Sequence, residues 1–347
     1  MGVNMGILRF LPNPIFINIY LTNECNLRCK HCIDNSGYLT DEEKCNELSN
    51  QEIVYLLDYY IDRGVRNFSF SGGEPLLRKE IYDFISHIKK KNADVEVTII
   101  TNGTLIDKNV AEKLADLKVN YVRVSVESHN PKIHDWIRGT GNFDRVMNGL
   151  KNLLTTNISK IGVSITVNKE NIKQIDDTVS FLYNMGLRHI TMAPLMPAGR
   201  GENMREYLLS RDDFKKLLSK KCAYESKYPD VIFTLDTPLL AILSKDNAEA
   251  LEKYGPCVIG SCFLGFKSNG DVYACPMRDE VIIGNLRKDN LDDLWNHSPL
   301  LNQIRNLKLL KGKCKSCKLL NYCGGGCRAY THIVHNDFCE PDPFCWL

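Results

Sequence analysis

The strongest constraint on the fold is a repeated alternation of apolar runs and amphipathic segments over the first two thirds of the chain. The apolar runs are short and rich in β-branched residues, and the amphipathic segments have helical spacing. The predicted strands are Ile15–Leu21, Asn67–Ser71, Val95–Thr101, Tyr121–Glu127, Ile161–Val167 and His189–Pro194. The predicted helices are Gln51–Arg63, Lys79–Lys91, Asn109–Leu117, Phe143–Thr155, Ile172–Met185 and Arg211–Glu225. This pattern predicts an α/β fold with a parallel sheet, and it fits either an open doubly wound sheet or a partial (β/α)6 barrel.

The cysteines of the chain are concentrated towards its two ends. Of 14 in total, four lie in the first 45 residues, none lies between 46 and 221, and ten follow from 222 onward. The sequence has no apolar run of the roughly 18 residues that a membrane span needs and no signal peptide, so we expect a cytoplasmic protein without a membrane partner. In that reducing compartment the cysteines indicate metal binding or catalysis. A net charge of +2 gives no reason to expect a nucleic-acid partner.

Three cysteines follow the first predicted strand directly. Cys25, Cys29 and Cys32 have the spacing C-x3-C-x2-C. Three soft thiolates on one short loop suit an iron–sulfur cluster in which one iron has no protein ligand. The alternatives are a zinc site or buried free cysteines, although zinc normally takes a fourth protein ligand nearby.

This loop, with His31 before its third cysteine, resembles the signature of the radical S-adenosylmethionine (SAM) enzymes. The resemblance implies that the three thiolates hold a [4Fe-4S] cluster, that the fourth iron binds the amino and carboxylate groups of SAM, and that His31 lies at the cofactor. One electron then cleaves SAM to methionine and a 5′-deoxyadenosyl radical, which abstracts a hydrogen atom from the substrate. The resemblance also favours the partial, TIM-like barrel, with the site at the C-terminal ends of the strands.

A Gly-Gly-Glu sequence follows the second predicted strand. Gly72 and Gly73 allow the backbone to approach a ligand closely, and Glu74 places a carboxylate at the strand end. Two glycines after a strand usually form only a turn, but here they stand where the family carries the motif that binds the SAM amino group. The stretch 101–104, Thr-Asn-Gly-Thr, is also similar to the family pattern and either lines the cofactor cleft or forms an Asn-Gly turn.

The fourth, fifth and sixth predicted strands end in further candidate residues. In related enzymes a serine and nearby polar groups hold the carboxylate and ribose of SAM, which implies this role for Ser125, Glu127 and Arg138. Ser164 is another expected contact to SAM, and Met192 either packs on the adenine or belongs to the core. The alternatives for Ser125 and Arg138 are a turn cap and a surface ion pair.

A second cysteine pattern occupies the C-terminal part of the chain. Cys257-x12-Gly270-x4-Cys275, then C-x2-C-x5-C-x3-C, then a last cysteine, resembles the SPASM extension of some radical SAM enzymes. The resemblance implies two auxiliary [4Fe-4S] clusters. The first auxiliary set would be Cys257, Cys262, Cys275 and Cys327, and the second auxiliary set Cys314, Cys317, Cys323 and Cys345. The alternative is a pair of zinc-ribbon-like knots.

Some assignments in this extension stay open. Cys262 is the least certain ligand, because the equivalent position is open in some relatives. Cys45, Cys222 and Cys339 have no assigned place, although Cys339 could replace Cys345 as the last ligand. We expect a radical SAM partial barrel over residues 1–210, a helical bridge over 211–255 and a small cysteine-rich SPASM domain over 256–347.

The resemblance predicts a radical SAM enzyme that oxidatively modifies a peptide or protein substrate with the help of the auxiliary clusters. An external electron donor such as flavodoxin or ferredoxin is expected. Only 24 residues precede Cys25, so a peptide-recognition domain would be a separate protein. The alternatives are oxidative decarboxylation of a tetrapyrrole or other small molecule, and a non-catalytic electron-transfer protein.

Overall fold

The structure is a computed structural model that describes residues 10–243, 257–275 and 281–347. Strands in these ranges form one sheet in the order β10-β9-β8-β1-β2-β3-β4-β5-β6-β7. Their bounds are β1 Phe16–Thr22, β2 Asn67–Gly72, β3 Glu96–Thr101, β4 Tyr121–Ser125, β5 Lys160–Val167, β6 His189–Pro194, β7 Ile232–Leu235, β8 Phe263–Phe266, β9 Asp271–Tyr273 and β10 Ile282–Asn285. Strands β1 to β7 pair in parallel and in sequence order, which is the arrangement of the expected partial barrel.

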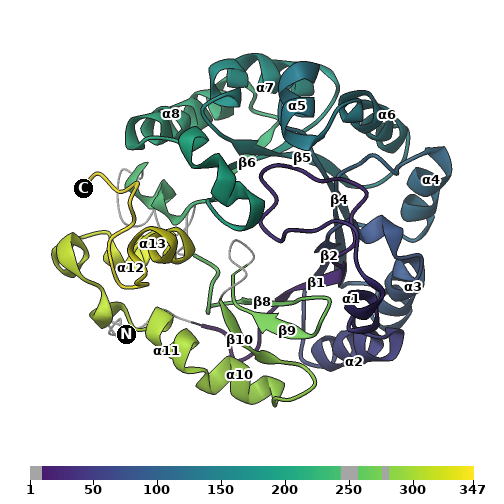
Figure 1. The fold of residues 1–347 in the computed structure, drawn as a ribbon, viewed down its shortest axis with the longest axis horizontal. Coiled ribbons are helices and arrows are strands. Elements are labelled where there is room, and N and C mark those ends of the chain that lie inside the picture. Colours follow the sequence, from purple (N-terminus) through teal and green to yellow (C-terminus); the bar gives the residue numbers. More distant parts are fainter. Residues whose placement is uncertain (1–9, 244–256, 276–280) are drawn as a thin grey trace.

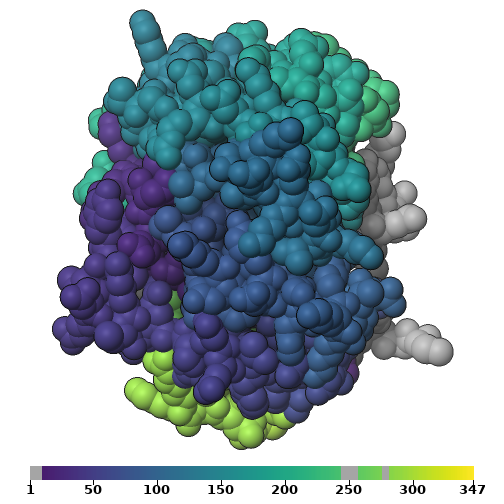
Figure 2. Space-filling model, turned by 90° about the vertical axis from the view of Figure 1, so that its right-hand side faces the viewer, coloured from purple at the N-terminus to yellow at the C-terminus, as the bar shows by residue number. Residues whose placement is uncertain are grey.

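Helices cover the convex side of the curved sheet (Figure 1). Their bounds are α1 Asp41–Cys45, α2 Asn50–Ile61, α3 Ile81–Lys91, α4 Lys108–Asp116, α5 Pro131–Arg138, α6 Asn142–Leu154, α7 Ile175–Asn184 and α8 Arg211–Lys227. The space-filling view of that side shows a continuous surface of these segments, coloured purple to teal (Figure 2). The apolar stripes of the helices face buried strand residues such as Ile17, Phe68 and Val122. All six predicted strands and all six predicted helices are therefore confirmed.

The structure differs from the sequence prediction mainly after the fourth strand. Strand β4 ends at Ser125, two residues before the predicted end, and the short helix α5 that follows was not predicted. Asn130 caps α5 and Pro131 occupies its first turn, a combination that favours helix initiation. Glu127 consequently lies in the connection between β4 and α5.

The sheet extends beyond the six predicted units at both edges. On one side β7 adds in parallel to β6, so the described part of the expected bridge contributes a helix and a strand to the barrel. On the other side β8 adds in parallel to β1, with Ile17 opposite Leu264, and β9 and β10 continue antiparallel. The pairing of β8 with β1 attaches the cysteine-rich region to the barrel.

The C-terminal helices are α10 Leu291–His297, α11 Pro299–Arg305, α12 Leu320–Cys323 and α13 Arg328–His335. They pack on the open side of the barrel (Figure 1). Trp295 of α10 is buried and donates from Nε1 to the carbonyl oxygen of Leu11 at 2.9 Å. The ring of Phe344 stacks on that of Phe214 at a centroid distance of 4.4 Å and on that of Tyr330 at 4.7 Å. This stack joins α8 to the C-terminal region. No helix in the described parts of the chain is long and apolar enough to cross a membrane.

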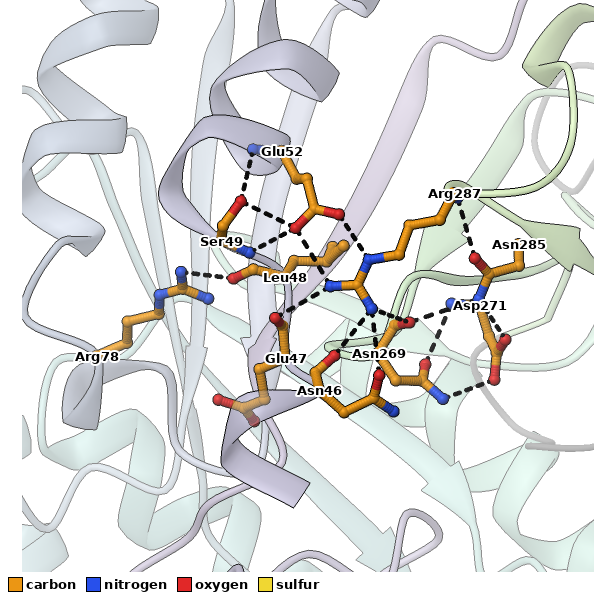
Figure 3. A network of polar contacts seen from close by, with 10 residues as sticks. All are labelled: Asn46, Glu47, Leu48, Ser49, Glu52, Arg78, Asn269, Asp271, Asn285 and Arg287. Atoms are coloured by element: carbon orange, nitrogen blue, oxygen red, sulfur yellow. Dashed lines mark hydrogen bonds and ion pairs between the residues drawn. The ribbon is translucent and has the colours of Figure 1, made fainter. Parts of the chain in front are cut away.

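Arg287 connects the turn after β10 to the segment between α1 and α2 (Figure 3). Its guanidinium contacts the carboxylate of Glu52 at 2.6 Å and donates to the carbonyl oxygens of Asn46 and Glu47, both at 3.1 Å. The hydrogen bond from Arg287 is the main reason that the pKa of Glu52 is lowered to about 2. This network fixes the cysteine-rich region against the start of α2.

We expect Arg287→Met to lower the free energy of unfolding by about 1–3 kcal/mol, because several charge-assisted hydrogen bonds are lost together. Arg205→Met is the matched control, since Arg205 forms an ion pair with Glu202 on an exposed turn and should cost less than about 1 kcal/mol. Denaturant unfolding of both variants measures the difference. Equal losses would show that the Arg287 network does not stabilise the fold.

Candidate active site and metal centres

A cavity of about 390 Å³ lies at the C-terminal ends of the barrel strands. The loop that carries Cys25, Cys29 and Cys32 forms one wall, and the ends of the strands form the others. Its volume is within the range of small-molecule sites. The cavity lies where the sequence places the cofactor, at the strand ends of a parallel α/β barrel.

The cysteine loop is held to the barrel by hydrogen bonds to its backbone. Arg200 donates from Nε to the carbonyl oxygen of Cys29 and from its backbone amide to that of Cys32, both at 2.8 Å. Lys30 donates its backbone amide to Ile137 of α5. These contacts leave the three thiols facing the cavity.

Burial favours the neutral form of these thiols. It raises the pKa of Cys25 to about 12 and also raises the pKa of Cys29. Two donors oppose the effect of burial on the pKa: the backbone amide of Leu27, 3.5 Å from the sulfur of Cys25, and Arg138 Nη1, 3.8 Å from that of Cys29. Asn102 Nδ2 also lies 3.9 Å from the sulfur of Cys25. Such donors stabilise thiolates, which is the form that binds iron.

The Gly-Gly-Glu segment divides its functions between backbone and side chain. Gly72 and Gly73 line the cavity, and a Cβ at Gly73 would overlap the carbonyl oxygen of Glu24. The Glu74 side chain is buried outside the cavity lining, where its carboxylate accepts from Thr101 Oγ1 at 2.7 Å and from the amide of Asn102 at 2.8 Å. Burial raises the pKa of Glu74 to about 7. Thr101, the last residue of β3, and Asn102, which follows it, themselves line the cavity.

Glu127, Arg138 and His31 form one buried group beside the cysteines. Arg138 contacts the Glu127 carboxylate at 2.6 Å, and His31 Nε2 lies 3.0 Å from the same oxygen. Burial disfavours the charged Glu127, but Arg138 and His31 more than offset it, and the pKa of Glu127 is lowered to about 2. Arg138 and His31 line the cavity, whereas Glu127 is 0% exposed behind them. The Glu127 side chain therefore orients the other two residues.

Of the remaining predicted SAM contacts, two line the cavity and one is buried in the core. Ser125 and Ser164 are opposite each other in the register of β4 and β5, and both line the cavity. Met192 is fully buried in the core, and Met196 lines the cavity instead. Arg123 also lines the cavity, and sequence reasoning missed it. Its spacing of two from Ser125 could have revealed it, because residues two apart on a strand point to the same face.

The auxiliary cysteines lie around two further cavities. Cys257, Cys275 and Cys327 line one of about 360 Å³, and all four members of the second auxiliary set, Cys314, Cys317, Cys323 and Cys345, line the other. Cys262 does not line the first of these cavities. It is still close to Cys257, because the pKa of Cys257, which is raised mainly by burial, is raised further by charge repulsion from Cys262. Cys345, and not Cys339, is on the wall of the second cavity. Cys45 and Cys222 are on neither wall.

These donor sets suit clusters better than single ions. Across the described ranges, no three His, Cys, Asp or Glu side chains converge closely enough to hold one metal ion. A four-iron cluster takes its thiolates at separate corners, and the thiols around the first auxiliary cavity of about 360 Å³ are spread in this way, whereas the cavity at the second set measures only about 20 Å³. Soft thiolates are also the ligands that iron–sulfur clusters use.

The fold and these cysteines define an iron–sulfur protein built on a partial barrel. Residues 19–182 match the model of the Radical SAM superfamily, and residues 257–318 match that of an iron–sulfur cluster-binding domain, SPASM. The chain belongs to the radical SAM superfamily and carries a C-terminal SPASM region. It is a radical SAM enzyme, with SAM, the [4Fe-4S] cluster of that superfamily and SPASM auxiliary clusters as cofactors.

Similar proteins fall into two groups. Mycofactocin maturase MftC from Mycolicibacterium smegmatis is 28% identical, covering 97% of this chain and 84% of that protein. From Methanosarcina barkeri, AdoMet-dependent heme synthase is 28% identical, covering 96% of both, and Fe-coproporphyrin III synthase is 30% identical, covering 94% and 86%. Streptococcus suis SuiB bound to its precursor peptide SuiA has the same fold, with a TM-score of 0.78, 21% identity and coverage of 97% and 77%.

We expect Glu127→Gln to lower the free energy of unfolding by about 3 kcal/mol, because the buried Arg138 loses its charged partner. Glu170→Gln is the control, since Glu170 forms an exposed ion pair with Lys173 and should cost less than about 1 kcal/mol. Denaturant unfolding measures both losses, and iron content measures retention of the first cluster. A Glu127→Gln variant as stable as the Glu170→Gln control would show that the buried Arg138 does not depend on the charge of Glu127.

Proposed function

We propose that this enzyme uses SAM to generate a 5′-deoxyadenosyl radical and oxidatively modifies a peptide or protein substrate. Cys25, Cys29 and Cys32 would hold the cluster that supplies the electron. SAM would contact the backbone of Gly72 and Gly73 and four cavity-lining side chains, His31, Ser125, Arg138 and Ser164. Glu74 and Glu127 would act from behind this lining.

The observation that carries the proposal is a wall shared by two cavities. Arg123, Pro194, Met196, Asp236 and Phe263 line both the cavity at the cysteine loop and the cavity at the first auxiliary set. A substrate on this wall would face the SAM site on one side and the auxiliary thiols on the other. Hydrogen abstraction and electron removal would then occur at opposite ends of one chamber.

The charges on the shared wall favour a peptide over a tetrapyrrole. It offers one cation, Arg123, and one carboxylate, Asp236. Burial raises the pKa of Asp236, and the charge of Arg123 opposes that rise. Arg138 is already paired with Glu127, and Arg200 is bonded to Cys29. A tetrapyrrole with several carboxylates would require more free cations, whereas a peptide presents both donors and acceptors.

Two groups of relatives support different substrates. The maturase MftC, and SuiB with its bound precursor peptide, support a peptide. The heme synthase and the Fe-coproporphyrin III synthase support the second candidate, oxidative decarboxylation of a tetrapyrrole. We further propose an external electron donor such as flavodoxin or ferredoxin.

The first test is cofactor loading and SAM cleavage without oxygen. We expect about twelve irons per chain for three four-iron clusters, and 5′-deoxyadenosine after addition of SAM and a strong reductant. Cys29→Ala should abolish 5′-deoxyadenosine while retaining the auxiliary iron, whereas Cys45→Ala, an exposed cysteine outside the cavities, should change neither. Failure of wild-type protein to bind SAM would contradict the proposal.

The second test distinguishes the substrates. The loaded enzyme is incubated with a precursor peptide encoded beside its gene, or with Fe-coproporphyrin III, and the products are analysed by mass spectrometry. We expect a mass change in the peptide that depends on SAM. Loss of carbon dioxide from the porphyrin, with an unchanged peptide, would instead establish the second candidate.

A further inference from the structure

Arg328, at the start of α13, is a buried cation without a hydrogen-bond partner. Arg328 is only 1% exposed, and its Nε, Nη1 and Nη2 atoms all lack a hydrogen-bond partner among the described residues. Arg305, which is 2% exposed, instead donates from Nε to the carbonyl oxygen of Gly260 at 2.7 Å and from Nη1 to that of Trp295 at 2.8 Å, and only its Nη2 lacks a partner among the described residues. An unsatisfied buried guanidinium is costly, so its persistence requires a partner that the protein atoms do not provide.

The surroundings of Arg328 identify where that partner lies. Arg328 directly follows Cys327, a member of the first auxiliary set that lines the first auxiliary cavity. Its Nη1 lies beside Gly325, which lines the second auxiliary cavity together with Cys314 and Cys323. The guanidinium therefore lies between segments that carry cysteines of both sets.

The loop around Arg328 is shaped to admit its guanidinium. A Cβ at Gly325 would overlap Nη1 of Arg328, so the Gly-Gly-Gly stretch between Cys323 and Cys327 makes room for it. The nearby carboxylate of Asp342 lines both auxiliary cavities, but its oxygens already accept from the amides of Cys327 at 2.7 Å and Phe344 at 2.8 Å. No ion pair between Asp342 and Arg328 forms within the described part of the chain.

We propose that Arg328 is a positioning residue shared by the two auxiliary clusters, donating hydrogen bonds towards the sulfur atoms of both. This inference rests on the assignment of both auxiliary sets in the proposed function. A [4Fe-4S] cluster with four thiolates is an anion and becomes more negative when reduced. A buried cation stabilises the reduced form, so Arg328 raises both reduction potentials.

The planar guanidinium suits this position better than an ammonium group. It has five N–H donors pointing in fixed and divergent directions, whereas lysine offers one compact charge. Arg328→Lys should therefore keep part of the charge effect and lose the simultaneous contacts. Arg328→Met removes both.

The test is a redox titration followed by electron paramagnetic resonance of the two auxiliary clusters. A Cys25→Ala/Cys29→Ala/Cys32→Ala background removes the first cluster, so the auxiliary signals are observed alone. We expect Arg328→Met to shift both midpoint potentials to more negative values and Arg328→Lys to shift them less. Lys308→Met, which removes an exposed charge from the same region, should leave both potentials unchanged.

Each result decides between clear alternatives. Full iron in Arg328→Met with both potentials unchanged would overturn the proposal, as would a shift of only one potential. If Arg328→Met loses auxiliary iron, the decision passes to Arg328→Lys, where retained iron with both potentials shifted supports the proposal, and unchanged potentials, a shift of only one potential or loss of iron overturns it. Wild-type protein with only four irons would contradict the auxiliary assignment itself, which separates that failure from failure of the role of Arg328.

Discussion

The geometry of the active site depends on the buried ion pair between Glu127 and Arg138. One oxygen of Glu127 contacts Arg138 and His31, and the other accepts from the amide of Thr166 in β5 at 2.9 Å. Arg138 in turn approaches the sulfur of Cys29. Because desolvation largely cancels the attraction within a buried ion pair, the pair contributes position more than stability. It ties the cysteine loop to α5 and to two strands of the barrel.

Arg138 and Arg328 are both buried near cysteines, but only Arg138 has its charge neutralised by a carboxylate. Arg138 is neutralised by Glu127, so the environment of the first cysteine group carries little net charge from this pair. Arg328 has no hydrogen-bond partner in the described residues and brings a full positive charge between the auxiliary sets. A protein can tune clusters separately by such differences in burial, hydrogen bonding and charge.

Much of the fold could be predicted from the sequence, because alternating β-branched runs and amphipathic helices are local signals. The cysteine loop and the serines of β4 and β5 were also placed at the correct end of the barrel. The side-chain directions of Glu127 and Met192 could not be predicted, since they depend on where β4 stops and on how β6 packs. The lack of a hydrogen-bond partner for Arg328 depends on contacts between segments far apart in sequence, and the spacing of residues along the chain does not reveal such contacts.

The pairing of β1 with β8 has a consequence for the order in which the barrel forms. Ile17 and Leu264 are register partners, 247 positions apart in the chain (264 − 17). During synthesis, the edge of β1 that faces β8 has no partner until residues 263–266 have been made. An apolar strand with a free edge is prone to pair with other chains, and non-local pairing is slow. A truncated chain that ends before β8 would therefore expose the strand that leads into the cysteine loop.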